Sequence, residues 1–384
     1  MASSLPSGHG SAQIPEINLA VDGSGLARSW AGVGTYTTHL LRAMSHHRPK
    51  ATFTVYAPPG VGLELPSVSL HPLPRLKLIG RHLLWPLRLR RSGADLYLGC
   101  VGQLPLGGVG MPAVVTAHDL AIYRHPEWFP PGQWLSTRAI VPRSFRQADM
   151  VLAVSHHTAS DLTELMGLSP ERIRVAPLGV DPALQPLQPA EREVARRQLQ
   201  LPERFILFVS TLEPRKNLIT LIDAWERLRD RPELVVVGGW GWRCEEIRTR
   251  LDKVRGGIRL LGAVPPQELP ALYSLATCLA HPAWYEGFGL PPLEAMACGT
   301  PVVASNSSSL PEVVGEAGLL VDPADVEGWT AALAQMLGDE QLRQELQIRG
   351  FQRTTELSWE QTAQATWEVI DEILTYPTGV LDSP

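Results

Sequence analysis

The sequence has 384 residues, a length that suits two or three domains at roughly 150 residues each. Hydrophobic residues make up 44% of the chain and charged residues 19%, which is a globular composition and excludes disorder over most of the length. The formal net charge of -5 argues against a general nucleic-acid-binding surface. We expect no signal peptide and no membrane span, because no apolar run approaches the roughly 20 residues that a span needs.

Short apolar runs alternate with helical segments along most of the chain. The first predicted strand is 17–23 and the first predicted helix is 33–44, while Ser155 is the predicted N-cap of a helix that ends at Gly167. The alternation weakens over 181–205, which we interpret as an interdomain connection with a short surface helix. The pattern predicts two doubly wound α/β halves with parallel sheets and a cleft between them.

The four cysteines are scattered along the chain without a C-x-x-C pair, at Cys100, Cys244, Cys278 and Cys298. The sequence therefore predicts neither a disulfide framework nor a zinc site, and we expect free thiols in a reducing cytoplasm. No aspartates are spaced as D-x-D, so no divalent metal is expected to bridge the protein to a diphosphate through that motif.

The stretch EGFGLPPLEAMACG combines a glycine turn with a predicted helix. Pro291 and Pro292 suit the first turn of that helix, and Gly299 suits its end. Free N–H groups at the helix start suit a phosphate, and Glu286 and Glu294 are placed to reach hydroxyl groups of the same ligand. The alternative is a capped core helix with two solvated acids, but the glycine turn between the acids argues against it.

A pair of cations follows the first strand of the second half. Arg215 and Lys216 come just before Asn217, the predicted N-cap of the next helix. Two cations beside a helix N-terminus suit a diphosphate by charge and by dipole. The alternative is a solvated basic turn.

Two weaker signals lie in the first half. Gly32 and Gly34 allow backbone to approach a ligand, but their spacing is not that of the dinucleotide-binding motif and an ordinary glycine loop also fits. His118 ends a predicted strand, where it can bond a sugar or move a proton, although a structural histidine is the commoner case. His156 and His157 point in different directions on a helix and indicate a helix start rather than a metal site.

Taken together, these motifs resemble the retaining family-4 glycosyltransferases with the GT-B fold. The resemblance rests on E-x7-E from Glu286 to Glu294 and on LEPRKN, HDL, VSHHTASDL, RIRVAPLGVD and AGVGTYT, which occur in the right order. It runs from about Ile17 to about Leu374.

The resemblance implies a fold of two Rossmann-like domains that face each other across a cleft. Residues 15–185 would form the acceptor domain, and 186–357 would bind the nucleotide-diphosphate-sugar donor. The C-terminal helix at 358–375 would cross back to the first domain.

The resemblance also implies a role for each candidate residue. Glu286 would meet the sugar hydroxyls, Glu294 the ribose, and His118 the sugar near its 6-position. Lys216 and Arg215 would hold the diphosphate, and Arg215 would carry more of its charge because Ser210 and Thr211 stand where several relatives have an extra arginine. Further donor contacts would come from the glycine turn, the opposite domain and the base pocket at 261–266, namely Gly287, Phe288, Gly289, Leu290, Gly32, Gly34 and Val264.

The implied reaction is transfer with retention by front-face attack, in which the leaving diphosphate takes the acceptor proton and no protein general base is needed. AGVGTYTTHLLRAM and EPRKN are most similar to the mannosyl- and rhamnosyltransferases of bacterial surface polysaccharides, so GDP-mannose is the first expected donor and UDP-glucose or a dTDP-sugar the second. We expect no metal and no cofactor beyond this co-substrate. A sugar-nucleotide 2-epimerase would share the scaffold, but the E-x7-E stretch argues against it. A degenerate, non-catalytic sugar-nucleotide-binding protein would be expected to have lost Glu286 or Lys216, and both are present.

The stretch 74–94 contains cations and no acid, interleaved with leucines and Trp85. Its cations are Arg75, Lys77, Arg81, Arg88, Arg90 and Arg91. This composition suits the surface of an anionic membrane, where the protein would act peripherally at the inner face on a lipid-linked acceptor. A buried helix with solvated arginines at its edge fits the composition equally well.

Overall fold

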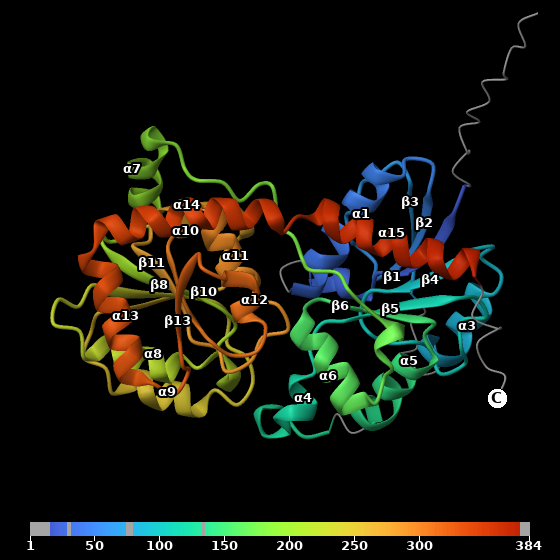
Figure 1. Ribbon diagram of the computed structural model, residues 1–384, viewed down its shortest axis with the longest axis horizontal. Helices are drawn as coiled ribbons and strands as arrows, with labels where there is room; N and C mark the ends of the chain where they lie inside the picture. The colour runs from blue at the N-terminus through green and yellow to red at the C-terminus, as the bar shows by residue number, and fades with distance from the viewer. Residues whose placement is uncertain (1–15, 29–31, 74–79, 133–134, 377–384) are drawn as a thin grey trace, which may run out of the picture.

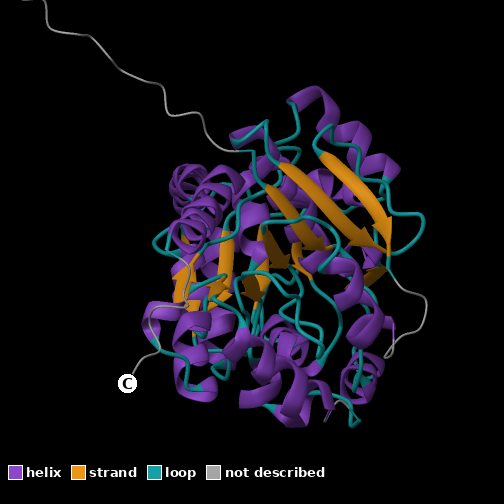
Figure 2. Ribbon diagram, turned by 90° about the vertical axis from the view of Figure 1, so that its right-hand side faces the viewer, coloured by secondary structure: helices purple, strands orange, loops and turns teal. Residues whose placement is uncertain are grey.

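The computed structural model describes residues 16–28, 32–73, 80–132 and 135–376. They form two α/β lobes that lie side by side, with α14 and α15 running along one edge of both (Figure 1). Helices lie on both sides of the strands (Figure 2). Within these residues, no helix has both the length and the apolar character needed to cross a membrane.

The first lobe contains a seven-stranded parallel sheet in the order β3-β2-β1-β4-β5-β6-β7. Its central strands are continuous buried apolar runs, as expected for a parallel sheet covered on both faces. The strands are β1 Asn18–Asp22, β2 Thr52–Ala57, β3 Val68–Pro72, β4 Leu96–Gly99, β5 Ala113–Ala117, β6 Met150–Ala153 and β7 Ile173–Val175. The helices are α1 Gly32–His47, α3 Trp85–Leu89, α4 Ala121–Arg124, α5 Val141–Gln147 and α6 His156–Met166, with π-helical turns at Gly80–Leu84 and Ser136–Ile140.

The second lobe contains a six-stranded parallel sheet in the order β10-β9-β8-β11-β12-β13. Its strands are β8 Phe205–Val209, β9 Glu233–Val237, β10 Ile258–Gly262, β11 Cys278–His281, β12 Val302–Ser305 and β13 Gly318–Val321. Its helices are α7 Pro189–Gln198, α8 Leu218–Glu226, α9 Glu245–Asp252, α10 Leu269–Leu275, α11 Leu290–Ala297, α12 Leu310–Val314, α13 Val326–Gly338 and α14 Glu340–Glu356. The predicted surface helix of the connecting segment is α7, which has no buried residue.

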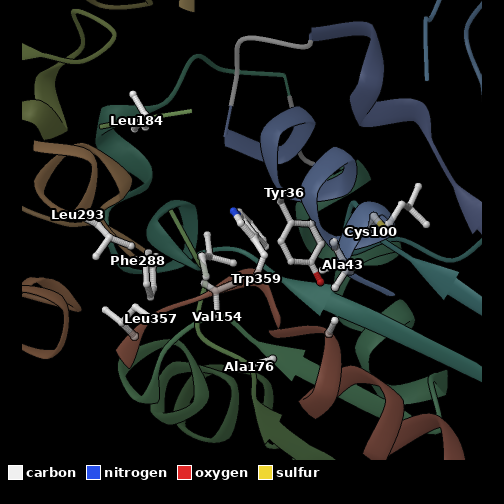
Figure 3. Packing of buried hydrophobic residues seen from close by; sticks show 14 of the residues in the cluster. Tyr36, Ala43, Cys100, Val154, Ala176, Leu184, Phe288, Leu293, Leu357 and Trp359 are labelled. Carbon is white, nitrogen blue, oxygen red and sulfur yellow. The ribbon is translucent and has the colours of Figure 1, made fainter. Parts of the chain in front are cut away.

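The C-terminal helix α15, Trp359–Thr375, crosses back onto the first lobe as predicted. Arg48 of the first lobe, just after α1, donates to Asp371 at 2.8 Å, and the ring of Trp359 lies 6.1 Å from that of Tyr36. One cluster of buried apolar side chains continues from Tyr36 through Trp359 to Phe288 of the second lobe (Figure 3). The crossing helix thus joins the two lobes through a shared core.

Several predicted local features are confirmed. The Ser155 hydroxyl accepts from the Thr158 N–H at 3.0 Å at the start of α6, and Gly167 ends that helix with φ 65°. Gly299 follows α11 with φ 76°, a left-handed conformation that favours glycine. All four cysteines are buried and free.

Candidate functional site

The strand order reverses beside the first strand of each lobe, between β1 and β4 and between β8 and β11. Open α/β sheets bind ligands beyond the carboxyl ends of their strands at such a switch point. In the second lobe, the loop after β8 carries Arg215 and Lys216, and the loop after β11 carries Glu286. The residues predicted from two distant motifs therefore meet at the switch point.

The central contact of the site is an ion pair between Lys216 and Glu286. Lys216 Nζ lies 2.5 Å from Glu286 Oε1, and His281 Nε2 lies 2.8 Å from the same oxygen. All three side chains are buried, with Glu286 only 7% exposed. The Glu286 N–H donates to the Ser308 hydroxyl at 2.8 Å, which fixes the backbone at this position.

The electrostatic surroundings keep Glu286 ionised. Burial by itself would raise the pKa of Glu286, but Lys216, the hydrogen bond from His281 and Arg215 hold that pKa well below its usual range. Burial lowers the pKa of His281, so its ring is neutral at pH 7 and Nε2–H donates to Glu286. An ionised glutamate only accepts hydrogen bonds, so Glu286 can orient hydroxyl groups and stabilise positive charge but cannot donate a proton.

Arg215 is surrounded by carboxylates. Its Nε lies 2.5 Å from Glu213 Oε1, and its Nη1 lies 3.6 Å from Glu286 Oε2 and 4.0 Å from Asp119 Oδ2 of the first lobe. Burial by itself would lower the pKa of Arg215, but these carboxylates raise it above its usual value. Both cations of the predicted diphosphate site are thus already paired, and a bound phosphate would compete with carboxylates for them.

Asn217 corrects the sequence prediction. It occupies the N-cap position of α8, but its φ of 56° is left-handed and its side chain caps no N–H of the helix. Instead, its amide nitrogen donates to the carbonyl groups of Pro282 at 3.0 Å and Pro323 at 2.8 Å, and its amide oxygen accepts from the Thr220 hydroxyl. The side chain therefore links the loops after β8, β11 and β13.

The glycine turn after Glu286 packs tightly against the first lobe. A Cβ on Gly287 would lie 1.7 Å from the His118 carbonyl oxygen, so only glycine fits there. The Gly287 carbonyl accepts from the hydroxyls of Ser155 at 2.7 Å and Thr158 at 3.2 Å. Within the described residues, the N–H groups of Gly287, Phe288 and Gly289 donate to no protein acceptor, and all three residues are buried.

Glu294 lies on α11, apart from the Lys216–Glu286 pair. It accepts from the Tyr273 hydroxyl at 2.7 Å, and burial raises the pKa of its carboxyl group. Val264 and Leu290 are partly buried and pack against the same core cluster to which side chains of α11 belong. Phe288 is buried in that core, so its ring is structural and only its backbone remains for a ligand.

In the first lobe, His118 follows β5. Its Nε2 lies 2.7 Å from the Cys100 carbonyl oxygen, and its ring meets that of Tyr36 edge-on at 4.8 Å. Burial lowers its pKa, so the neutral ring donates from Nε2 and leaves Nδ1 as an acceptor. Gly32 and Gly34 open α1, and Ala31 of the glycine loop lies outside the described residues.

Contacts between the lobes involve residues that the sequence did not single out. The Tyr285 hydroxyl donates to Asp161 Oδ2 at 2.5 Å. Glu312 of the second lobe accepts from the N–H groups of His156 at 2.7 Å and His157 at 2.6 Å, and so caps α6 from across the cleft. The two histidines begin a helix, as predicted. No local signal marks Tyr285 or Glu312, because each finds its partner in the other lobe.

Comparison with known proteins supports one family. The profile for "Glycosyl transferases group 1" matches residues 191–353, and that for "Glycosyltransferase Family 4" matches residues 30–184. The O-antigen chain mannosyltransferase B of Escherichia coli is 37% identical over 261 residues, which span 66% of this chain and 68% of the relative. The MMP alpha-(1->4)-mannosyltransferase of Mycolicibacterium hassiacum is 33% identical over 290 residues, which span 71% of this chain and 68% of the relative.

Solved structures show the same fold. Sucrose-phosphate synthase from Thermosynechococcus elongatus superposes with a TM-score of 0.75 at 24% identity, over 94% of this chain and all of that one. WaaG, a glycosyltransferase involved in lipopolysaccharide biosynthesis, superposes with a TM-score of 0.71 at 18% identity, over 92% and 99% of the two chains. The predicted GT-B architecture is confirmed.

Proposed function

This chain belongs to the glycosyltransferases of group 1 and family 4, and on that premise we propose that it is a retaining hexosyltransferase that moves mannose from GDP-mannose to a glycan or lipid-linked acceptor. The buried Lys216–Glu286 pair at the switch point of the second lobe carries the proposal. A degenerate, non-catalytic binding protein is expected to have lost one of these two residues, and this chain keeps both in contact.

The choice of mannose rests on the relatives, since both of those described above are mannosyltransferases by name. UDP-glucose and dTDP-sugars are the alternative donors. The proposed acceptor, a surface polysaccharide or glycolipid precursor at the cytoplasmic face of the membrane, rests on the O-antigen relative.

In the proposed reaction, the acceptor hydroxyl forms a bond to the anomeric carbon on the face from which the diphosphate departs. The bond between that carbon and the diphosphate oxygen breaks, and the acceptor proton passes to the leaving oxygen. Lys216 and Arg215 exchange carboxylate contacts for phosphate contacts, which frees Glu286 to accept from sugar hydroxyls and to face the developing positive charge. His118 stays neutral and contacts the sugar through Nδ1, and Glu294 accepts from the ribose.

The first experiment measures thermal stabilisation of the protein by GDP-, UDP-, ADP- and dTDP-sugars. A ligand at 100 times its Kd stabilises the folded state by about 2.7 kcal/mol, so the correct donor is expected to raise the Tm clearly and selectively. The proposal predicts that GDP-mannose does so. A shift by another donor corrects the sugar, whereas no shift with any of them contradicts the function.

Two features of the reaction need separate measurements. Retention predicts an α-linked product from an α-linked donor, which NMR of the anomeric proton detects at early times. Metal independence is proposed because the chain lacks D-x-D and places Arg215 and Lys216 at the diphosphate site. Turnover is then expected to persist in excess EDTA, and complete loss that magnesium restores contradicts this part of the proposal.

The described part of the basic stretch, 80–94, supports a peripheral membrane contact. Leu83 is 60% exposed and Leu87 49%, and they lie beside exposed Arg88 and Arg90. The first cations of the stretch, Arg75 and Lys77, lie outside the described residues. Apolar side chains next to cations, with no acid between them, suit an anionic lipid surface.

Two side chains of this stretch have partners within the protein, as the alternative of a buried helix implies for Trp85. Trp85 is fully buried, with its ring 5.7 Å from that of Tyr56 and 5.9 Å from that of Tyr97, so it belongs to the core rather than to a lipid interface. Arg81 is bound to Asp22 at 2.9 Å.

Co-sedimentation with phosphatidylglycerol vesicles tests the membrane contact. Leu83→Glu and Leu87→Glu are expected to abolish binding. Ile348→Glu, at a position with the same 60% exposure as Leu83 but in the other lobe, is the matched control and is expected to bind like the wild type. Equal binding by all four proteins, or none by the wild type, rules the contact out.

A further inference from the structure

A pocket of about 670 Å³ lies between the lobes next to the loops that carry Arg215 and Glu286. The first lobe contributes Glu127 and Trp128 to it, and the second contributes Trp284 and Arg243. A second hollow of about 340 Å³ shares Ile219, Glu245 and Glu246 with it and continues along α9. The two hollows together form an elongated groove, which we call the cleft groove.

Its lining has the chemistry of a carbohydrate site. Trp128 and Trp284 line the pocket, and one face of the Trp128 ring is covered by His125, which stacks on it at 4.0 Å. An indole ring has a flat apolar face with an N–H group at its edge, and a pyranose ring offers a matching C–H face with hydroxyls around its rim. The carboxylates of Glu127, Glu245 and Glu246 accept hydrogen bonds from hydroxyls. The groove carries as many cations as acids, because Arg243, Arg250 and Lys253 line it together with the three glutamates. It therefore has no excess positive charge to attract a phosphate or a nucleotide, and it suits a neutral ligand rich in hydroxyl groups.

Contacts across the groove tie its walls together. Arg243 donates to the Glu127 carbonyl oxygen of the other lobe, and the rings of Phe129 and Trp242 lie 5.8 Å apart across the same gap. Arg243 has a φ of 52°, and Asn217, which also lines the pocket from the second lobe, has a φ of 56°. Strained conformations of non-glycine residues gather at functional sites, because the surrounding structure must hold them in place.

The groove begins next to the reaction centre. Pro214 precedes Arg215, and Trp284 stands two residues before Glu286. The backbone N–H of Trp284 donates to the Arg215 carbonyl oxygen at 2.8 Å, so the main chain at this tryptophan is fixed to the loop that carries Arg215 and Lys216.

We infer that the cleft groove binds the sugar chain of the acceptor, with Trp128 and Trp284 stacking against successive sugar rings and the three glutamates accepting from their hydroxyls. The inference rests on the proposed function and deepens it, because it makes the acceptor an oligosaccharide that occupies more than one sugar subsite. It also makes both lobes contribute to acceptor binding, so that a longer acceptor holds the lobes together.

Isothermal titration calorimetry in the absence of donor tests the inference with two probes, a tetrasaccharide of α-linked mannose and one of α-linked glucose. We expect one of them to bind, and Trp128→Ala and Trp284→Ala each to weaken that binding about tenfold, since truncating a stacked tryptophan at a binding centre typically costs more than about 1 kcal/mol. Trp284→Phe is expected to restore most of the affinity. Urea unfolding of each variant checks that it is folded.

Trp240→Ala is the matched control. Trp240 lies on the same loop as Trp242, is 42% exposed and stacks under Arg248 at 3.7 Å, but it does not line the groove. This variant is expected to bind like the wild type. The inference is overturned if neither tetrasaccharide binds the wild type, or if Trp128→Ala and Trp284→Ala bind as Trp240→Ala does.

The outcomes separate the groove from the reaction. Binding that depends on the two tryptophans, without sugar transfer from any donor, supports the groove and contradicts the proposed function. Transfer with an unchanged acceptor KM in Trp128→Ala and Trp284→Ala supports the function and contradicts the groove.

Discussion

Replacing Lys216 by methionine removes the cation nearest to Glu286 while nearly preserving the length of the side chain. The Glu286 carboxylate then stays buried, at 7% exposure, with His281 at 2.8 Å and Arg215 at 3.6 Å as its remaining partners. Removing one partner of a buried ion pair costs about 3–5 kcal/mol. Because Arg215 and His281 still compensate part of the charge, we expect a loss of about 2–3 kcal/mol in the free energy of unfolding.

The double variant Lys216→Met/Glu286→Gln separates stability from catalysis. It removes both charges, and the glutamine oxygen still accepts from His281, so its stability is expected to return to within about 1 kcal/mol of the wild type. Turnover is not expected to return, because the two groups proposed to stabilise charge in the transition state are gone. A loss of about 10²–10³-fold per group is typical of such electrostatic contacts.

Urea unfolding followed by circular dichroism measures the first effect, and release of nucleoside diphosphate measures the second. If Lys216→Met is as stable as the wild type, or the double variant is no more stable than the single one, the pair does not balance a buried charge. If either variant turns over at the wild-type rate, the two residues do not form the reaction centre.

Three further predictions follow from contacts of the site. Gly287→Ala is expected to push the lobes apart, because the added methyl group would lie 1.7 Å from the His118 carbonyl oxygen. X-ray scattering is expected to show a larger radius of gyration, and turnover is expected to fall. An unchanged radius of gyration and unchanged turnover would contradict this prediction. Folding lowers the pKa of His281 from 6.5 and that of Glu286 from 4.5. Because the unfolded chain then binds protons more readily than the folded protein, the free energy of unfolding falls as the pH drops below 6.5 for His281 and below 4.5 for Glu286. Urea unfolding from pH 7 down to 4 is expected to show this loss, with a shallower slope in His281→Gln, and equal slopes contradict it. Glu312→Ala removes the acceptor of the His156 and His157 N–H groups but leaves the Ser155 cap of α6 in place, and it is expected to cost about 1 kcal/mol of stability, which an unchanged Tm would disprove.

The alternation of strands and helices could be predicted from the sequence because it depends on local periodicity. The N-cap at Ser155 and the glycine at position 167 act within one or two turns of their own helix, and both predictions are confirmed. The crossing of α15 could be predicted only from the resemblance, since its partner Arg48 lies 323 residues before Asp371 in the chain.

The roles of side chains could not be predicted from the sequence where their partners lie in other loops or strands. Asn217 appeared to be a helix cap, but its amide bonds the carbonyls of Pro282 and Pro323 in two other loops. The composition of 74–94 left a membrane surface and a buried helix equally open for Trp85, which packs against Tyr56 and Tyr97 of the first sheet. Only the adjacency of β8 and β11 brings the two charged motifs together, and a sequence shows no such adjacency.

The most direct test of the central claim is the steady-state release of nucleoside diphosphate from GDP-mannose with an α-linked mannose tetrasaccharide as acceptor, in the wild type and in the double variant Lys216→Met/Glu286→Gln. The wild type is expected to transfer mannose with retention, and the double variant to stay folded and lose turnover by at least about 10²-fold. A wild type that transfers no sugar from any of the GDP-, UDP-, ADP- or dTDP-sugars, or a double variant that turns over at the wild-type rate, would contradict the assignment of this site as the reaction centre.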